Sequence, residues 1–266
     1  MTIGQARRSR VMRERWNSGN NATDRYKARV AELAHPGSAI LHAGCGWDKK
    51  DVSGPYRHLC RVVGVDADPS VATRFHSEFH LADLAEIPLE DASFDLVLCE
   101  YTVEHLPDPL AALSEMGRVL KPGGRILVLT PNLGSYKVAA AAVTPHSFHL
   151  AMGRIRYGAG QDADRYPTLY KCNTPGAFRR LARQAGLTIL STELVTNGPT
   201  WFERFPVAFG VFDLMHRAME RWEALRWLRC ALIVELTRPP QPGPWYTTAD
   251  RPTGTRNPAS PKGPAG

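Results

Sequence analysis

The sequence predicts an α/β fold, with helices on both faces of a largely parallel sheet. Short apolar runs, rich in leucine and β-branched residues, alternate with segments that carry helix start and stop signals. The runs are almost continuously apolar, which is typical of strands covered on both faces. Strand–helix–strand units of this kind join through right-handed crossovers. The expected strands span 38–44, 61–68, 79–84, 94–100, 124–131, 187–195 and 230–239.

Helices are expected in three of the gaps between these strands. Each begins with a capping residue followed by proline, a pair that suits the N-cap and the first helical position. The pairs are Asp68–Pro69, Asp108–Pro109 and Thr174–Pro175. Lys121-Pro122-Gly123-Gly124 ends the second helix, and Gly186 ends the third.

Composition indicates one sizeable domain in a reducing compartment. The chain has 266 residues, of which 43% are hydrophobic and 22% charged. Its five cysteines are odd in number and show no CxxC spacing, so neither a disulfide framework nor a metal site is expected, and a cytoplasmic location fits best. The net charge of +7 is spread along the chain without a basic stripe, so no nucleic-acid partner is expected.

Four segments lie outside the alternation of strands and helices. Residues 1–239 are expected to form the domain, with 1–35 as a helical cap and 240–266 as a disordered tail rich in proline and glycine. Two long connections, 133–173 and 197–229, are expected to be functional insertions, and the first is interpreted as a lid facing the acceptor.

The second insertion carries an amphipathic pattern. Several interpretations remain open for residues 199–229: peripheral contact with a membrane surface, a homodimer interface, a cover for the sheet, or the wall of an apolar pocket. Leu214, Ala218, Trp222, Leu225 and Leu228 follow helical spacing, with Arg217, Arg221, Arg226 and Arg229 between them.

The stretch "ILHAGCGWDKK" (40–50) predicts a glycine turn after the first strand, where ligands of open α/β sheets bind. A dinucleotide phosphate would need a helix N-terminus directly after this turn. Gly54-Pro55 breaks any long helix there, and Asp48 adds a negative charge. The loop therefore favours a nucleoside without phosphates, and an NAD-binding oxidoreductase is disfavoured.

Two acidic residues follow the next two strands and agree with a nucleoside ligand. Asp66 closes the second strand, where its carboxylate can accept hydrogen bonds from a ribose diol. Asp83 closes the third strand, where it can accept from an adenine amino group. Each aspartate alone could equally be a turn or helix cap, but together they favour an adenosine site.

These motifs resemble those of class I S-adenosylmethionine-dependent methyltransferases, in the broad group of ubiquinone-biosynthesis-like enzymes. The resemblance rests on "ILHAGCGW", "VVGVDAD", "LADLAEIPLEDASFDLVLCEYTVEHLPDP" and "EMGRVLKPGGRILVLTPN". It covers roughly residues 38–135 and resumes at "NTPGAFRRLARQAGL". It implies a Rossmann-like, doubly wound sheet of seven strands, mostly parallel, with an antiparallel last strand inserted before the sixth.

The resemblance implies a role for each matched residue. Gly44, Cys45 and Gly46 would pass under the methionine and ribose, and Asp66 and Ala67 would contact the ribose and adenine. Asp83 and Leu84 would line the adenine pocket, while Glu100 and Tyr101 would lie near the methionyl part. His42 is also expected among the cofactor-binding residues, although the sequence departs from the family there, where an acidic residue is common. It departs again at Asp48, where a third glycine is common. Asp48 supplying the missing charge remains open.

A base is needed only if the acceptor must lose a proton. His105 of the "VEHL" motif is one candidate, and His146 and His149 of the first insertion are others, although packing and surface roles remain open for all three. Tyr136, Tyr166 and Tyr170 are interpreted as acceptor-pocket residues or as packing residues.

The predicted function is therefore methyl transfer from S-adenosylmethionine in biosynthesis. The acceptor is expected to be a small molecule or a lipid- or glycan-linked group, with O-methylation first. N- or C-methylation and a non-catalytic scaffold with the same fold are the alternatives.

Overall fold

The computed structural model describes residues 21–48, 50–72, 78–136, 167–197 and 206–240. Seven strands form one sheet in the order β3-β2-β1-β4-β5-β7-β6. Strand β7 is antiparallel to both β5 and β6, and the other pairs are parallel. This confirms the predicted fold class, including the antiparallel last strand between the fifth and sixth.

Each predicted strand is present, with ends that shift by a few residues. They are β1 (Ala39–Ala43), β2 (Arg61–Asp66), β3 (Glu78–Leu81), β4 (Phe94–Glu100), β5 (Leu120–Pro131), β6 (Thr188–Val195) and β7 (Ala231–Thr237). The largest difference is in β5, which begins at Leu120 rather than at 124. Leu120 pairs with Phe94 before a register shift, so the Lys121–Gly124 segment both ends the preceding helix and belongs to the strand.

The described helices are α2 (Ala22–Leu33), α3 (Pro109–Val119), α6 (Pro175–Gln184) and α7 (Pro206–Arg221). The predicted caps are confirmed for α3, where Asp108 accepts from the backbone N–H groups of Leu110 and Ala111, and for α6, where Thr174 accepts from Ala177. The third pair, Asp68–Pro69, begins only a 3-10 turn, η2 (Pro69–Val71), and residues 73–77 lie outside the described part.

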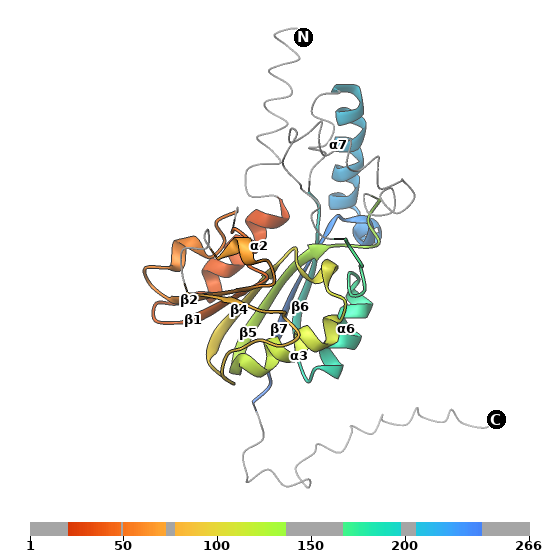
Figure 1. Cartoon of the computed structure of the whole chain (residues 1–266). Coiled ribbons are helices and arrows are strands. Elements are labelled where there is room, and N and C mark those ends of the chain that lie inside the picture. Colours follow the sequence, from red (N-terminus) through yellow and green to blue (C-terminus); the bar gives the residue numbers. More distant parts are fainter. Residues whose placement is uncertain (1–20, 49, 73–77, 137–166, 198–205, 241–266) are drawn as a thin grey trace, which may run out of the picture.

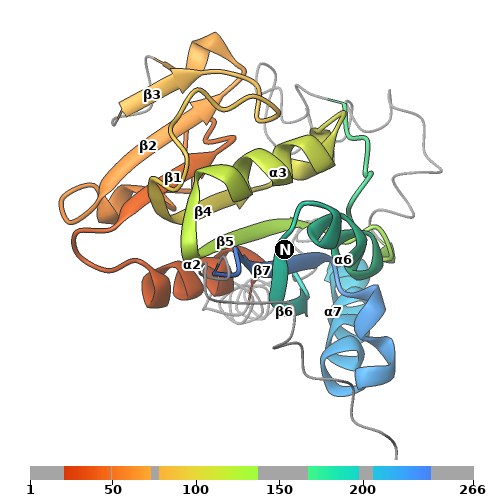
Figure 2. The same cartoon turned by 90° about the horizontal axis from the view of Figure 1, so that it is seen from below.

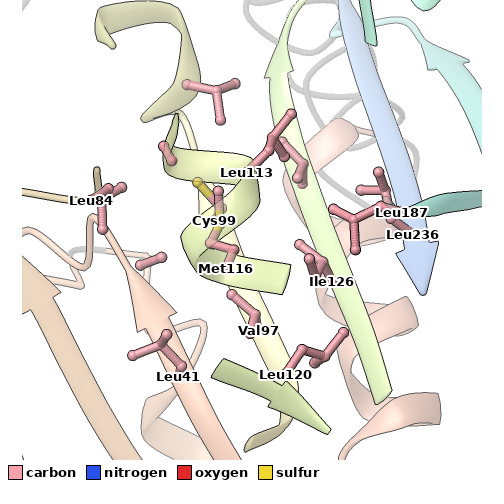
Figure 3. Packing of buried hydrophobic residues seen from close by; sticks show 14 of the residues in the cluster. Leu41, Leu84, Val97, Cys99, Leu113, Met116, Leu120, Ile126, Leu187 and Leu236 are labelled. Atoms are coloured by element: carbon pink, nitrogen blue, oxygen red, sulfur yellow. The ribbon is translucent and has the colours of Figure 1, made fainter. Parts of the chain in front are cut away.

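The helices cover both faces of the sheet (Figures 1 and 2). Helices α3 and α6 pack on one face through residues such as Met116 and Phe178, and α2 packs on the other through Tyr26 and Val30. Neighbouring residues of a strand enter opposite layers, as Leu96 and Val97 do in β4. Figure 3 shows the layer under α3, in which Leu113 and Met116 lie over side chains from β1, β4 and β5. Burial on both faces explains why the strands are apolar throughout.

Part of the second insertion stands beyond the sheet. Helix α7 and the following 3-10 segment η5 (Glu223–Leu228) lie past the end where β5 finishes and β7 begins (Figure 1). No helix in the described ranges is long and apolar enough to cross a membrane. The predicted N-terminal cap is described only from residue 21, and the predicted tail from 241 onward lies outside the described residues.

The Tyr26 hydroxyl connects α2 to the middle of the sheet. It donates to the Leu127 carbonyl oxygen at 2.8 Å and accepts from the Cys99 N–H at 3.1 Å, and the side chain is fully buried. Tyr26→Phe leaves both backbone groups without this partner, so we expect the free energy of unfolding to fall by about 1–3 kcal/mol. Urea denaturation measures this difference. Tyr56→Phe is the control, and an equal change in both variants would contradict the prediction.

Candidate active site

The first strand ends in a turn that requires glycine at its first position. The N–H groups of Gly44 and Cys45 both donate to the Val65 carbonyl oxygen, at 2.8 and 3.2 Å, so the turn lies against the end of β2. Gly44 has φ +67°, and a Cβ atom there would lie 2.2 Å from Cγ2 of Thr102. Thr102 follows β4, so the turn can approach both neighbouring strands only because residue 44 has no side chain.

Asp66 joins this turn to the tip of β2. Its Oδ2 atom accepts from the Gly46 N–H at 2.8 Å, and its Oδ1 atom accepts from the Asp68 N–H at 2.9 Å. Each carboxylate oxygen has two lone pairs, so each keeps one for a ligand hydroxyl. A Cβ atom on Gly46 would meet nothing within 4 Å, so the backbone beside the carboxylate is open. This arrangement fits a ribose diol and the nucleoside that carries it.

Asp48 has a different role from Asp66. Its carboxylate accepts from the N–H groups of Val52 and Ser53, from the Ser53 hydroxyl and from Arg57, and its side chain is 3% exposed. These donors all come from residues 52–57, so the Asp48 carboxylate stabilises its own loop. The described part of the loop then forms only a 3-10 turn, η1 (Gly54–Tyr56), and provides no α-helix N-terminus after the glycine turn. The geometry disfavours both a phosphate ligand and Asp48 as the partner of a methionine ammonium group.

A lysine that the sequence analysis did not single out lies over the end of β4. Lys50 Nζ lies 2.9 Å from Glu100 Oε1 and 3.7 Å from the centroid of the Tyr101 ring, a cation–π contact. Tyr101 is itself held by Asn197, which donates to its hydroxyl at 3.4 Å, and burial raises the pKa of Tyr101 to about 12. The only signal for Lys50 was a charged "DKKD" run, which is typical of a solvated loop.

Two predicted residues lie beneath the turn. His42 is 2% exposed on β1, and burial lowers its pKa, although the Asp48, Glu100 and Asp66 carboxylates act in the opposite direction. A neutral imidazole is therefore favoured at this position. Burial also raises the pKa of the Cys45 thiol well above its ordinary value, so Cys45 is unsuited to act as a nucleophile.

The predicted adenine residues lie near the ends of β2 and β3. Ala67 is exposed beyond β2. Asp83 is exposed after β3, and its Oδ1 atom accepts from the Ala85 N–H at 2.8 Å, so one oxygen caps a turn. The Leu84 side chain is buried in the core layer shown in Figure 3, so only its backbone is placed to face a ligand.

The "VEHL" motif holds the segment that returns from the first insertion. Glu104 is 3% exposed, and its Oε2 atom accepts from the Thr130 hydroxyl at 2.9 Å. Asn173 donates to the same hydroxyl oxygen at 2.6 Å. The Glu104 carbonyl oxygen accepts from Leu169 and Tyr170, and the His105 ring lies 3.1 Å from the Pro167 carbonyl oxygen. Burial raises the pKa of Glu104.

Comparison with known proteins identifies this arrangement. Residues 41–128 match the family model described as a methyltransferase domain. They form a methyltransferase domain. A probable S-adenosylmethionine-dependent methyltransferase of Mycolicibacterium smegmatis is 38% identical over 117 residues, which cover 41% of this chain and 44% of that relative. The predicted methyltransferase family is confirmed for residues 41–128, and the name of this relative includes the predicted cofactor, S-adenosylmethionine.

Other relatives of the methyltransferase domain are named for methylation of different atoms. The ubiquinone biosynthesis O-methyltransferase of Xanthomonas campestris is 31% identical over 138 residues, covering 48% of this chain and 53% of that protein, and C-methyltransferases also occur among the relatives. The chain spans about half the length of the curated relatives that it matches. A solved S-adenosylmethionine-dependent methyltransferase of Mesorhizobium loti shares the fold, with a TM-score of 0.55 at 16% identity over 82% of this chain and 98% of that one.

In the described residues, the two insertions of the methyltransferase domain meet at Tyr136. The Tyr136 hydroxyl lies 2.7 Å from Nε2 of His216 on α7, and the Tyr136 ring stacks on Phe212. His216 is fully buried, and Asn132 donates to the carbonyl oxygens of Trp227 and Arg229 nearby. The sequence analysis missed His216 because its partner lies 80 residues earlier. His146, His149 and Tyr166 lie outside the described residues.

The raised pKa of Glu104 predicts a specific pH dependence of stability. The folded state favours the protonated carboxyl, so its contribution is complete below the ordinary pKa of 4.5 and is lost as the pH rises through the folded-state pKa. Glu104→Gln keeps an acceptor oxygen for Thr130 and removes this loss. We expect the variant to gain stability relative to the wild-type protein as the pH rises above 4.5.

Urea denaturation at a series of pH values checks this expectation. Glu86→Gln, which changes an exposed glutamate, is the matched control and should follow the wild-type curve. A constant difference between Glu104→Gln and the wild-type protein at all pH values would contradict the assignment.

Proposed function

We propose that this protein transfers a methyl group from S-adenosylmethionine to a small-molecule or lipid- or glycan-linked acceptor, with a hydroxyl oxygen as the first choice. The observation that carries this proposal is the Asp66 carboxylate, bonded to Gly46 and beside an open backbone. C-methylation is the alternative that relatives keep open, and N-methylation and a non-catalytic scaffold remain weaker alternatives. We include a cytoplasmic location, because all five cysteines are free and buried. We also include a biosynthetic role, because one relative is a ubiquinone biosynthesis O-methyltransferase.

The proposed cofactor site follows the carboxyl edge of the sheet. Gly44, Cys45 and Gly46 would pass under the cofactor, and the two oxygens of Asp66 would accept from the ribose hydroxyls. Ala67 would lie against the adenine, with the exposed oxygen of Asp83 accepting from its amino group and the Leu84 backbone beside it. When bound, the cofactor supplies an activated methyl group on a sulfonium.

The methionyl end would be held by a pair of opposite charges. Its ammonium and carboxylate groups are complementary to Glu100 and Lys50, whose charged atoms lie 2.9 Å apart. Glu100 has a side chain that is only 8% exposed, so a charge-assisted contact there is weakly screened. This pair supplies the negative charge that the family commonly has at position 42, where this chain has a buried histidine. Tyr101, fixed under Lys50, would form the floor of this end.

A hydroxyl acceptor would lose its proton during transfer, and two candidate bases lie in the described residues. His105 stays a candidate, with its ring close to the Pro167 carbonyl oxygen. The Tyr136–His216 pair is the second, because Tyr136 is half-buried while His216 can receive a proton through the 2.7 Å contact. The acceptor hydroxyl would give its proton to the Tyr136 oxygen as the Tyr136 proton moves to Nε2 of His216. His146 and His149 remain predictions.

Two variants should separate the nucleoside end from the methionyl end. Asp66→Ala removes the ribose acceptor, so we expect at least a tenfold loss of affinity for both S-adenosylhomocysteine and methylthioadenosine, the analogue without the amino-acid end. Lys50→Met removes the partner of the methionine carboxylate, together with the contacts of Lys50 to Glu100 and Tyr101, and leaves the contacts of Asp66 in place. It should lose affinity for S-adenosylhomocysteine and keep its affinity for methylthioadenosine. Isothermal titration calorimetry measures all four values.

Asp91→Asn is the matched control, because Asp91 is an exposed aspartate far from the glycine turn. Wild-type affinity in Asp66→Ala would remove the basis of the proposed cofactor site. Equal losses for both ligands in Lys50→Met would reject the zwitterion assignment alone.

The proton route is tested with methyl-labelled S-adenosylmethionine and a panel of phenols, sugars and long-chain alcohols. With any hydroxyl acceptor that is methylated, we expect Tyr136→Phe to lower kcat about 10²–10⁴-fold while cofactor affinity stays unchanged. His216→Gln should also lower kcat while cofactor affinity stays unchanged. A loss in His105→Gln, with full activity in Tyr136→Phe, would assign the proton to His105 instead.

A further inference from the structure

Helix α7 buries polar residues and exposes apolar ones. Its buried face carries Phe209, Asp213, His216 and Met219, two of which are polar or charged. Its opposite face exposes large apolar side chains at helical spacing: Val207 is 83%, Val211 63% and Leu214 69% exposed. Burying an aspartate and a histidine while leaving valine and leucine in water is unfavourable unless the outer face has a partner.

Two more large apolar side chains are exposed just after the end of the helix. Trp222 and Trp227 are 59% and 57% exposed, and they follow directly after Arg221 and Arg226 in the two Arg-Trp pairs of "RWEALRW". We call the five side chains Val207, Val211, Leu214, Trp222 and Trp227 the α7 outer face. Tryptophan next to arginine is typical of surfaces that sit at a lipid–water boundary, where the ring enters the headgroup layer and the cation meets phosphate.

We propose that the α7 outer face docks on an anionic lipid surface. The charges agree with this partner. Arg221 makes no ion pair with any other residue in the described ranges, and Arg226 pairs only with the exposed Glu223, a contact that lipid phosphate can replace at little cost. The buried acid Asp213 is already paired with Arg217 at 2.8 Å, so it does not repel the surface. The whole chain carries a net charge of +7.

The docking surface is joined to the candidate acceptor side. Tyr136 contacts His216 on the inner face of α7, and Asn132 bonds the backbone of η5, so α7 is fixed to the end of β5. Asn197, which begins the same insertion, contacts Tyr101 at the methionyl end. Docking would therefore place the acceptor side next to the lipid. This role of docking in acceptor binding rests on the proposed function, and it narrows the acceptor to an apolar molecule that partitions into lipid. The docking itself does not depend on the proposed function.

Vesicle sedimentation of the full chain tests the proposal. We expect the wild-type protein to bind vesicles of equimolar phosphatidylglycerol and phosphatidylcholine, to bind pure phosphatidylcholine more weakly, and to be released by salt. Val211→Glu with Leu214→Glu should lower the partition coefficient at least about tenfold. Arg221→Gln with Arg226→Gln should remove the preference for phosphatidylglycerol.

Each variant has a matched control elsewhere on the chain. Leu59→Glu with Leu190→Glu changes two exposed leucines, and Arg179→Gln with Arg180→Gln removes two exposed cations from α6. Both controls should bind vesicles nearly as the wild-type protein does. Equal binding by the Val211→Glu/Leu214→Glu variant, or no binding by the wild-type protein, would overturn the proposal. So would a wild-type dimer in size-exclusion chromatography that this variant dissociates without a change in vesicle binding.

Calorimetry with S-adenosylhomocysteine on the same samples separates this inference from the proposed function. All variants should keep the wild-type affinity, because none of the changed residues lies in the cofactor site. Cofactor binding without vesicle binding rejects the docking surface alone. Vesicle binding without cofactor binding rejects the methyltransferase function and leaves the docking surface in place.

Discussion

The hydrogen bond from the Gly46 N–H to Oδ2 of Asp66 is the contact on which the rest of the site depends. It spans 20 residues and fixes the glycine turn of one strand to the carboxylate at the tip of the next. The turn itself needs positive φ at both Gly44 and Gly46. If the carboxylate were free, it would sample several rotamers in water. Held between two N–H groups, it presents its remaining lone pairs in one direction, and this preorganisation favours binding of a diol.

Around that contact, the carboxyl edge is assembled from segments far apart in the sequence. Glu104, Thr130 and Asn173 tie the ends of β4 and β5 to the segment leading into α6. Tyr136 and His216 then tie β5 to α7. Buried polar contacts of this kind are costly to leave unpaired, so each one strongly favours a single arrangement of its two segments. Polar contacts therefore fix the arrangement of segments at the carboxyl edge, while apolar burial stabilises the sheet behind it.

The difference between an apolar sheet and a carboxyl edge fixed by polar contacts explains what could be predicted from the sequence. The strands, the Asp108 and Thr174 caps and Asp66 carry local signals, namely apolar runs, proline after a capping residue, and an acid at a strand end. Lys50, Glu104 and His216 carry no such signal, because their importance comes from partners in other segments. The helical spacing of α7 was also visible. The orientation of α7 was not visible, because the contact of His216 with Tyr136, which lies far away in the sequence, keeps a polar residue on the buried face.

The two departures from the family pattern, His42 and Asp48, are linked through electrostatics. Asp48 is buried and held by four donors, and it acts on His42 more strongly than the Glu100 and Asp66 carboxylates do. An acidic residue at position 42 would add a fourth carboxylate to this buried cluster, where like charges strongly disfavour ionisation. A neutral histidine avoids that repulsion, and Glu100 at the end of β4 keeps Lys50 as its partner. The histidine in β1 is thus compatible with an intact cofactor site, because β4 supplies the acid, Glu100, and the loop after β1 supplies the cation, Lys50.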